Sequence, residues 1–506
     1  MPNLLHNHIS PTFASLLTQA FILSMRLQKK IYYCFLSLFI SLAASAQNID
    51  VSANPAAAFT AGKDSLAKII IGAINISGNK KTKEFIIRRE IQLKHGDTIT
   101  VKSFGDELQK LQQQVYNTNL FLEVKLSVEE AGASIANINI AVKERWYIFP
   151  IPWFQLFDRN INEWIQKYNA DFDRVIYGAK FTHYNLTGHR DVLRLTLLNG
   201  FTRNISLSYF KPISDKKLNN GFSFSAGLIH NRQFIYKTDT LNKPVFFNNG
   251  SFSRKNYFLG AGYNFRRNIM GTHYFNIVFN HVSVADSLLD IKYNPNYFKG
   301  KSPHKNYVDF SYTYKYINAN NAVYPLKGTT ASVKLLKRGF GFTGGINMFS
   351  VEGSYNKYWA LQNDWYASTE LSAKTTMPFN QPYINQRALG YNDANLRGLE
   401  LYVVDGVAYG LSRNTLRKKL FTINIKTPFR SDKYHVIPFS VFAKAYGDWG
   451  AVYNKQQFQT SLNNKLLYSG GFGIDMLSIY DANLRIEYSF NQLGKNGLFL
   501  QVQSGL

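Results

Sequence analysis

The sequence predicts an α+β domain followed by an all-β transmembrane barrel of about 16 antiparallel strands. The first observation is a secretory leader at the N-terminus. The second is a strand–helix–helix–strand–strand pattern over residues 68–146, and the third is period-two alternation of apolar and polar residues over most of the remainder. No later segment has about 18 uninterrupted apolar residues, so we expect strands rather than helices to cross a membrane.

The N-terminal segment reads as a leader and signal peptide over residues 1–46. From Met25 it has a basic start, an apolar stretch at Ile31–Leu42 and a small-residue site at Ala44–Ala46. The apolar stretch is shorter than the roughly 20 residues of a spanning helix, and an uncleaved membrane anchor is the alternative. The only cysteine, Cys34, lies in this segment, so we expect no disulfide in the mature protein.

The composition favours contact with lipid. Aromatic residues make up 15 % of the chain, yet the mean hydropathy is −0.21. The formal net charge is +26. An exported protein this basic suits phosphate-rich lipid head groups or acidic partners. We expect outer-membrane lipids among its partners and no nucleic acid.

The predicted α+β domain follows a small, polar linker at residues 47–67. Its first strand ends in a turn at Gly78-Asn79. Thr82 is a candidate cap for a helix that stops at Gly96-Asp97. We expect these two turns to define the first half of the domain, which spans residues 68–146.

The second half of the domain contains a helix and two strands. Ser103 is a candidate cap for the helix, and strands at 121–130 and 133–146 are joined near Gly132. Apolar residues recur along this helix at helical spacing: Phe104, Leu108, Leu111 and Val115.

This order of elements, with "ISGNKKTKEFIIRREIQLKHGD" at residues 76–97, resembles a POTRA domain, the polypeptide-transport-associated module. The resemblance implies that an exposed edge strand binds extended client peptides by strand addition. A small α+β domain of unrelated role is the alternative.

A connector rich in proline and tryptophan, residues 147–174, leads into the predicted barrel at residues 175–506. "VDFSYTYKY" at 308–316 puts its aromatic residues on one face, and "LRIEYSFN" at 484–491 also alternates. A soluble sandwich would show the same alternation. The leader, the aromatic faces and strand lengths near the about 9–11 residues of a spanning strand favour a membrane barrel.

The connections between the predicted strands alternate between tight and long, as a barrel with a periplasmic N-terminal domain requires. The weak strand "QFIYKTDT" at 233–240 restores the alternation early and brings the total to about 16, an even number. The tight connections are 266–271, 320–328, 361–364, 431–436 and 479–482, and the long ones are 286–304, 378–406 and 452–465.

One long loop, between predicted strands 11 and 12, carries an arginine at its tip in "NLRGLE" (395–400). If Arg397 is buried inside the barrel, it needs an anionic or acceptor partner. Predicted strand 13 offers Asp448, which lies between Gly447 and Gly450. The same parity puts Ser440, Lys444 and Tyr446 inside, and puts Phe439, Val441 and Trp449 towards lipid. A solvated external arginine and an ordinary interior aspartate are the alternatives.

These segments resemble the BamA/TamA family of outer-membrane barrels, of the bacterial surface antigen type. "LRGL" at 396–399 matches the Arg-Gly tip of that family's lumen-docked loop, and "DWG" at 448–450 matches its aspartate–glycine motif. "NLTGHRDVL" at 185–193 is similar to its first hairpin, and "YPLKGT" at 324–329 to its Pro-x-x-Gly turn.

The resemblance implies a contact between the loop and the barrel made by Arg397, Gly398, Asp448 and Gly450, with Asn424 as an amide acceptor. Asn424 stands where the family has a glutamate, Leu399 where it has an aromatic residue, and Leu506 where its chains end in one.

The function that the resemblance implies is outer-membrane protein assembly or insertion. Unfolded outer-membrane or exported polypeptides would enter through a periplasmic POTRA domain and be inserted or translocated by the barrel, with periplasmic or lipoprotein accessory factors as further candidate partners. A dedicated secretion pore of the two-partner type and a passive channel are the alternatives. The sequence has no HExxH, GxSxG or P-loop pattern. We therefore expect no enzyme, no cofactor and no metal.

Overall fold

The structure, a computed structural model, describes residues 55–503 with internal gaps. The predicted leader at 1–46 and the terminal Leu506 lie outside the described residues. The chain divides into two compact units, one of residues 53–420 and 441–506 and the other containing residues 421–440. No helix in the described ranges is long and apolar enough to cross a membrane. The internal gaps are residues 61, 133, 158–168, 170, 216, 299, 341–345, 392–393, 427–435, 456–459 and 479–481.

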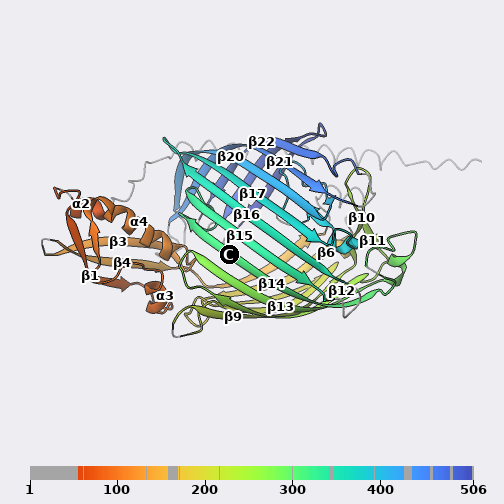
Figure 1. The fold of residues 1–506 in the computed structure, drawn as a ribbon, viewed down its shortest axis with the longest axis horizontal. Helices are drawn as coiled ribbons and strands as arrows, with labels where there is room; N and C mark the ends of the chain where they lie inside the picture. The colour runs from red at the N-terminus through yellow and green to blue at the C-terminus, as the bar shows by residue number, and fades with distance from the viewer. Residues whose placement is uncertain are drawn as a thin grey trace, which may run out of the picture. The chain divides into compact units, whose positions relative to one another are not determined.

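The N-terminal domain contains a four-stranded sheet in the order β2-β1-β4-β3, with three helices (Figure 1). β1 and β4 are parallel, and the outer pairs are antiparallel. The strands are β1 (Lys68–Ser77), β2 (Thr98–Thr100), β3 (Phe121–Gly132) and β4 (Ile135–Glu144). The helices are α2 (Pro55–Thr60), α3 (Glu84–Arg88) and α4 (Val101–Tyr116).

The core of this domain follows from period-two and helical spacing. The apolar residues predicted for the second helix are all buried on one face of α4, and they pack on Ile69 and Ile71 of β1 and on Ile138 and Ile140 of β4. Gly78 ends β1 with φ +86°, and a Cβ there would lie 2.0 Å from the carbonyl oxygen of Val142. Only glycine fits this turn.

Both predicted helix caps are wrong. α3 is shorter than expected and begins after Lys83, and the hydroxyl of Thr82 instead accepts a hydrogen bond from Asn185. α4 begins after Thr100, so Ser103 lies inside the helix. The predicted linker is also wrong in part, because α2 lies within it and buries Ala56 and Phe59 in the domain core. β2 was not predicted.

The rest of the chain forms an antiparallel sheet of 16 strands in which each strand pairs with its neighbours along the chain. The number and the up-and-down order agree with the prediction. The strands are β5 (Ile148–Leu156), β6 (Val175–Tyr184), β7 (Val192–Gly200), β8 (Thr202–Lys211), β9 (Asn220–Asn231), β12 (Arg254–Phe265), β13 (Gly271–Val284), β14 (His304–Ala319), β15 (Gly328–Arg338), β16 (Met348–Ala360), β17 (Trp365–Met377), β20 (Ala408–Lys426), β21 (Val436–Tyr453), β22 (Leu466–Leu477), β23 (Asn483–Asn491) and β24 (Asn496–Gln503).

Two predicted strand assignments are wrong, and their errors cancel in the total. β5 lies inside the predicted connector and pairs with β6 along its whole length, so the sheet begins earlier than residue 175. The segment "QFIYKTDT" is not a strand of this sheet. It forms β10 (Gln233–Thr238), which pairs with β11 (Pro244–Asn248) in a separate hairpin. The loop 378–407 still follows the eleventh strand, as predicted.

The two faces of the large sheet differ in the way that a membrane barrel requires. The outer face exposes large apolar side chains, such as Leu259 (53 % exposed), Ile277 (52 %) and Phe310 (44 %). The inner face buries charged groups such as Lys444 and Asp475. Exposed apolar and buried polar side chains are typical of a sheet surrounded by lipid. The sheet is barrel-like, although its terminal strands β5 and β24 are not hydrogen-bonded to each other in the described ranges.

We predict that Phe104→Ala destabilises the N-terminal domain by about 3–5 kcal/mol, because it leaves a cavity in a fully buried core. Limited proteolysis of the full chain should then show faster loss of the N-terminal fragment, while the sheet keeps its folded mobility in unheated gels. Lys110→Ala on the exposed side of α4 should leave both unchanged. Equal proteolysis of Phe104→Ala and Lys110→Ala would contradict the packing of α4.

Candidate functional site: the arginine loop inside the sheet

The loop at residues 378–407 packs against the inner face of the sheet. The two leucines that flank its Arg-Gly tip, Leu396 and Leu399, are 2 % and 5 % exposed. They share an apolar cluster with Leu411 of β20, Val452 of β21 and Leu467 of β22. Burial of these side chains holds the tip against three strands. Leu399 therefore packs well although the family has an aromatic residue there.

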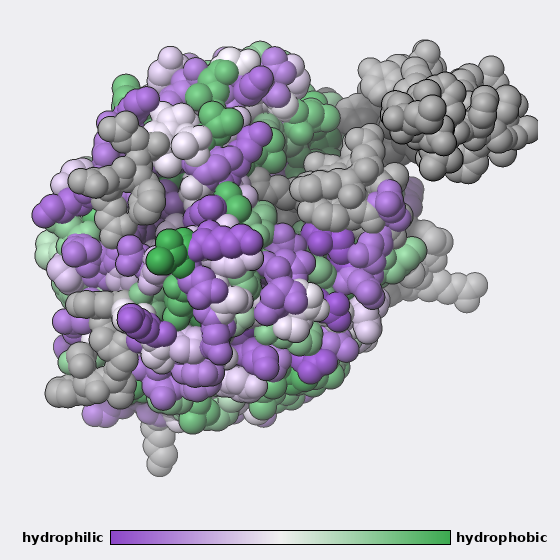
Figure 2. All heavy atoms as spheres, turned by 90° about the vertical axis from the view of Figure 1, so that its right-hand side faces the viewer, coloured by the Kyte–Doolittle hydropathy of each residue, from purple (hydrophilic) through white to green (hydrophobic). Residues whose placement is uncertain are grey.

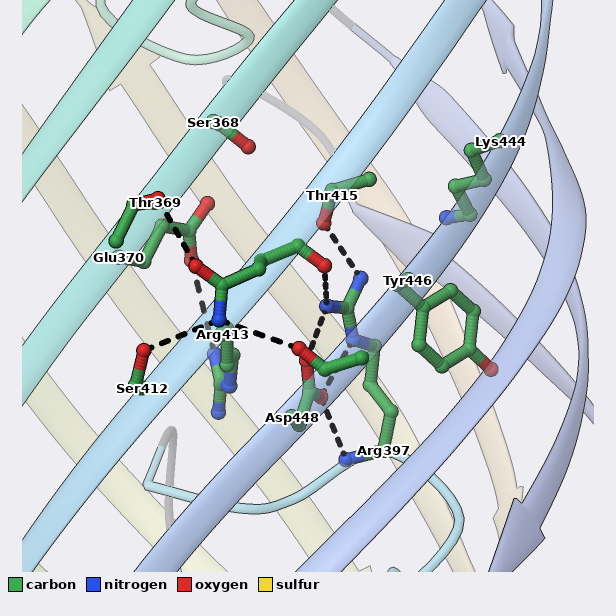
Figure 3. A network of polar contacts seen from close by, with 12 residues as sticks. Ser368, Thr369, Glu370, Arg397, Ser412, Arg413, Thr415, Lys444, Tyr446 and Asp448 are labelled. Atoms are coloured by element: carbon green, nitrogen blue, oxygen red, sulfur yellow. Dashed lines mark hydrogen bonds and ion pairs between the residues drawn. The ribbon is translucent and has the colours of Figure 1, made fainter.

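Arg397 and Asp448 come together as a buried ion pair (Figure 3). Arg397 Nε donates to Asp448 Oδ2 at 2.8 Å and Nη2 donates to Oδ1 at 2.5 Å, which is a bidentate arrangement. The Asp448 side chain is fully buried. Burial by itself lowers the pKa of Arg397, but Asp448 outweighs it and raises that pKa. Arg397 is therefore charged in this pair.

The rest of the guanidinium is also occupied. Nη1 donates to the hydroxyl of Thr415 at 3.0 Å, and Nη2 also donates to the carbonyl oxygen of Asn414 at 3.4 Å. The ring of Tyr446 lies 3.9 Å from the guanidinium carbon, close enough for a cation–π contact. The guanidinium of Arg397 thus joins the loop to the strands, because its edges form hydrogen bonds and its planar face lies on the ring of Tyr446.

The glycines predicted at this site allow close approach of the backbone. Gly398 has φ +86°, and a Cβ there would lie 2.9 Å from the Cβ of Ser489 on β23. Its carbonyl accepts from Asn491 Nδ2 at 2.7 Å. A Cβ at Gly450 would lie 2.8 Å from the carbonyl oxygen of Gly410. Both positions need glycine.

Asn424 is not a partner of Arg397. It is exposed near the end of β20, and that strand contributes Thr415 and Asn414 instead. The resemblance predicted a contact near the end of β20, whereas Arg397 contacts residues earlier in that strand. A sequence motif does not determine which residues of a strand lie opposite a distant loop. The predicted inward parity of Lys444, Tyr446 and Asp448 is right, and Trp449 is exposed as predicted, but Val441 is buried rather than lipid-facing.

Sequence reasoning missed three contacts of the loop. Arg413 Nε donates to the carbonyl oxygen of Asn395, just before the tip, at 2.9 Å. Glu400 accepts a hydrogen bond from the backbone N–H of Gly398 at 2.7 Å. At the far end of the loop, the carbonyl oxygen of Val403 accepts from the fully buried Asn242. The only sequence signal for these contacts was the presence of charged residues, Glu400 in the loop and Arg413 on the strand that follows it.

Asn242 also joins the loop to a third segment. It lies at the tip of the β10–β11 hairpin, and its Oδ1 accepts from the backbone N–H of Leu462 at 2.8 Å. Its Nδ2 reaches Asn463 Oδ1 at 3.2 Å. Three loops from different parts of the chain therefore meet at one amide side chain.

A second buried charge cluster, which no sequence motif predicts, lies on β20, β21, β22 and β23. Lys444 Nζ is 2.5 Å from Asp475 Oδ1 and 2.6 Å from Glu487 Oε1. The hydroxyl of Tyr324, in the turn between β14 and β15, donates to Asp475 Oδ2 at 2.8 Å. Arg417 Nε lies 3.6 Å from the same carboxylate. This cluster connects the turn 320–327, which contains Tyr324 of "YPLKGT", to the last strands of the sheet.

The predicted turn residues of the N-terminal domain have structural roles. Asn79 Nδ2 donates to the carbonyl oxygen of Thr82 at 3.1 Å. Gly96 has φ +88° and its N–H donates to Ile71, while Asp97 Oδ2 accepts from the N–H of Lys94 at 2.8 Å. These bonds close the two turns.

The domain and the sheet share one buried ion cluster around Glu90, which is 1 % exposed. Arg266, after β12, donates to both carboxylate oxygens at 2.5 and 2.8 Å. Burial alone would raise the pKa of Glu90, but Arg266 lowers it below the usual range. Arg89 donates to the carbonyl oxygens of Leu218 and Arg266, so the turns 212–219 and 266–270 both contact the segment after α3.

Comparison with known proteins covers the N-terminal domain best. Residues 69–145 match the POTRA family, described as a surface antigen variable number repeat. They span the four-stranded sheet and both α3 and α4. Residues 69–145 are a POTRA domain. The match covers this domain and not the sheet of 16 strands that follows it.

Whole-chain comparisons give weak similarity. A search of curated proteins finds no match. Among solved structures, BamA from Haemophilus ducreyi lacking POTRA domains 1–3 is 17 % identical, with 86 % of this chain and 84 % of that chain covered and a TM-score of 0.46. CdiB from Escherichia coli is 11 % identical, with 98 % of each chain covered and a TM-score of 0.46. CdiB from Acinetobacter baumannii is 10 % identical, with 86 % and 73 % covered and a TM-score of 0.45. The scores do not distinguish these proteins.

The chain thus joins a POTRA domain to a barrel-like sheet with an apolar outer face, the architecture of an outer-membrane β-barrel protein with a periplasmic POTRA domain. Because Glu90 of the POTRA domain contacts the turn 266–270, that end of the sheet is the periplasmic end. The long loops and the β10–β11 hairpin lie at the extracellular end (Figure 1).

We predict that Arg397→Met alone or Asp448→Leu alone lowers the free energy of unfolding by about 3–5 kcal/mol, because each leaves one buried charge unpaired. The double variant should be less destabilised than the sum of the singles, since no charge is then buried. Urea unfolding in detergent, followed by loss of folded mobility in unheated gels, measures both. Lys465→Met, at an exposed position, is the control. Additive effects of the two single substitutions on the free energy of unfolding would contradict the ion pair.

We predict that docking of the loop is more stable at pH 6 than at pH 8. Burial raises the pKa of Glu400 to about 7, with Glu487 and Asp448 adding repulsion. Because this pKa is raised in the folded state, the stabilising effect is present at low pH and is lost as the pH rises through about 7. Proteolysis of the loop should therefore be faster at pH 8. Glu400→Gln should remove most of the difference, and an unchanged pH dependence would contradict this role.

Proposed function

We propose that this protein inserts strand-rich polypeptides into the outer membrane, using its POTRA domain to receive them. The observation that carries the proposal is the pair of sheet ends, β5 and β24, which are not hydrogen-bonded to each other in the described ranges. A strand edge inside a membrane has backbone donors and acceptors that need partners. A client strand can supply them by strand addition.

The sequence of β5 supports this use of the edge. Pro150 and Pro152 lie on the same parity of the strand, and neither has an N–H to donate. Within sheets, proline is confined to edges, where the missing donor faces away from the partner strand. The backbones of Tyr147 and Phe157, of the opposite parity, bond towards β6, to Tyr184 and Arg174. The backbone positions of Pro150 and Pro152 therefore face the free edge. Pairing of β5 with β24 is thereby weaker than pairing between two complete strands.

The loop inside the sheet supports insertion over a passive channel. Arg397 is held by a bidentate ion pair, and the leucines on either side of it are buried. A passive pore along the inner face would require this loop to leave its ion pair and apolar cluster, which costs several kcal/mol of buried interactions. The free strand edges require no such step.

The experiment that tests the proposal is depletion of the protein followed by quantitative proteomics of the outer membrane. Loss of many unrelated barrel proteins is the expected result. Loss of one secreted protein alone would instead favour a dedicated secretion pore of the two-partner type. An unchanged outer-membrane proteome would contradict both and favour a passive channel.

We predict that the double variant Pro150→Val/Pro152→Val slows insertion of a barrel client into liposomes that contain the protein, by about tenfold or more. It restores two N–H donors on the free edge of β5 and so strengthens pairing with β24, each hydrogen bond contributing about 1 kcal/mol. Ile151→Val, on the opposite parity of the same strand, is the matched control. Unchanged insertion by a double variant that keeps its folded gel mobility would contradict the role of this edge.

A further inference from the structure

A group of cations and histidines lies on the outer face of the sheet at the extracellular ends of β8, β9, β12, β13 and β14. The strand register brings them side by side: Arg203 on β8 pairs with His230 on β9, which pairs with Lys255 on β12. Lys255 pairs with Ser283 on β13, and Ser283 pairs with His304 on β14. We call this group the rim patch.

Ring contacts make the rim patch continuous. The guanidinium groups of Arg203 and Arg232 lie 5.1 and 5.6 Å from the ring of Phe252, which contacts His230 at 5.7 Å. The ring of Tyr257 contacts both His230 at 5.3 Å and His281 at 6.0 Å, and the rings of His281 and His304 are stacked at 6.2 Å. Aromatic and cationic side chains at such a border are typical of a membrane interface.

The rim patch borders the lipid-facing band. Along β12, Lys255 has the same parity as the exposed Leu259, and along β13, His281 has the same parity as the exposed Ile277. The side chains of the patch therefore point outward, towards the level of the lipid head groups, and not into the sheet. The extracellular end itself is predominantly hydrophilic where it is visible (Figure 2).

The charges of the rim patch are not neutralised by the protein. The strands β8, β9, β12 and β13 contain no Asp or Glu, and the one acid of β14, Asp309, forms an ion pair with Arg338. In the described part of the chain, Arg203, Arg232 and Lys255 form no ion pair. The nearest acids along the chain, Asp215 and Asp239, accept hydrogen bonds from backbone N–H groups of their own turns. Because adjacent strands are about 4.8 Å apart, the backbones at Arg203 and Lys255 are only about 10 Å apart, and their like charges repel. An anion from outside the chain would relieve this repulsion.

We propose that the rim patch binds the phosphate groups of a phosphorylated lipid in the outer leaflet. Arginine fits phosphate through paired N–H donors, and lysine adds a point charge beside them. The position beside the apolar band selects a lipid over free phosphate, because the acyl chains of a bound lipid can pack on Leu259 and Ile277 while its head group meets the cations. This binding does not depend on the proposed insertion activity.

The test uses the full-length protein purified in detergent and diphosphorylated lipid A as the probe, at about 0.15 M salt, with native mass spectrometry to count bound lipid. Arg203→Gln/Lys255→Gln should weaken binding by about 30-fold, from the loss of two cations near the head group. The matched control is Lys465→Gln/Lys495→Gln, which removes two exposed cations from other extracellular turns and should leave binding unchanged. Arg203→Lys/Lys255→Arg keeps both charges and should retain most of the affinity.

Two further arms identify the ligand. Dephosphorylated lipid A should bind about as weakly to the native protein as lipid A binds to the Gln variant, and inorganic phosphate at millimolar concentration should not displace the lipid. Equal binding of the phosphorylated and dephosphorylated lipids would overturn the proposal, as would an unchanged affinity in an Arg203→Gln/Lys255→Gln protein that keeps its folded gel mobility. Displacement by inorganic phosphate would show a free-anion site and overturn the assignment to lipid.

Discussion

The ion pair between Arg397 and Asp448 is the interaction on which the interior of this protein depends. A guanidinium taken out of water is stable only with a partner, and here one carboxylate binds it through two hydrogen bonds while Thr415 and the ring of Tyr446 occupy its remaining sides. The pair fixes the tip of a loop of about 30 residues to β21. Gly398 then allows the tip to approach β23 more closely than any other residue could.

The same requirement for satisfied polar groups shapes the sheet. The 16 strands form 15 hydrogen-bonded neighbour pairs. The terminal strands β5 and β24 do not pair with each other in the described ranges, so the sheet is not closed there. The two prolines of β5 weaken pairing at this edge, because neither has an N–H to donate to β24. A barrel interior held by buried ion pairs therefore lies next to an edge whose pairing is weakened by the two prolines.

The two ends of the sheet have different chemistry. At the periplasmic end, the buried Glu90 of the POTRA domain neutralises Arg266, so the cation there is satisfied within the chain. At the extracellular end, Arg203, Arg232 and Lys255 face outward without acidic partners among the described residues. The high net charge of the chain is thus divided between cations that hold the fold together and cations that are available to an anionic surface.

Period-two alternation determined the two faces of the strands, and the spacing of Phe104, Leu108, Leu111 and Val115 determined the buried face of α4, because both depend only on local geometry. The sequence also brought Arg397 and Asp448 together through their parity and motifs. Only the tertiary structure decided that Thr415 rather than Asn424 completes the site, that residues 233–238 pair with β11 instead of joining the large sheet, and that Tyr324 reaches Asp475. Those outcomes depend on register and on contacts between residues far apart in the chain, and a one-residue change of register moves every side chain to the other face.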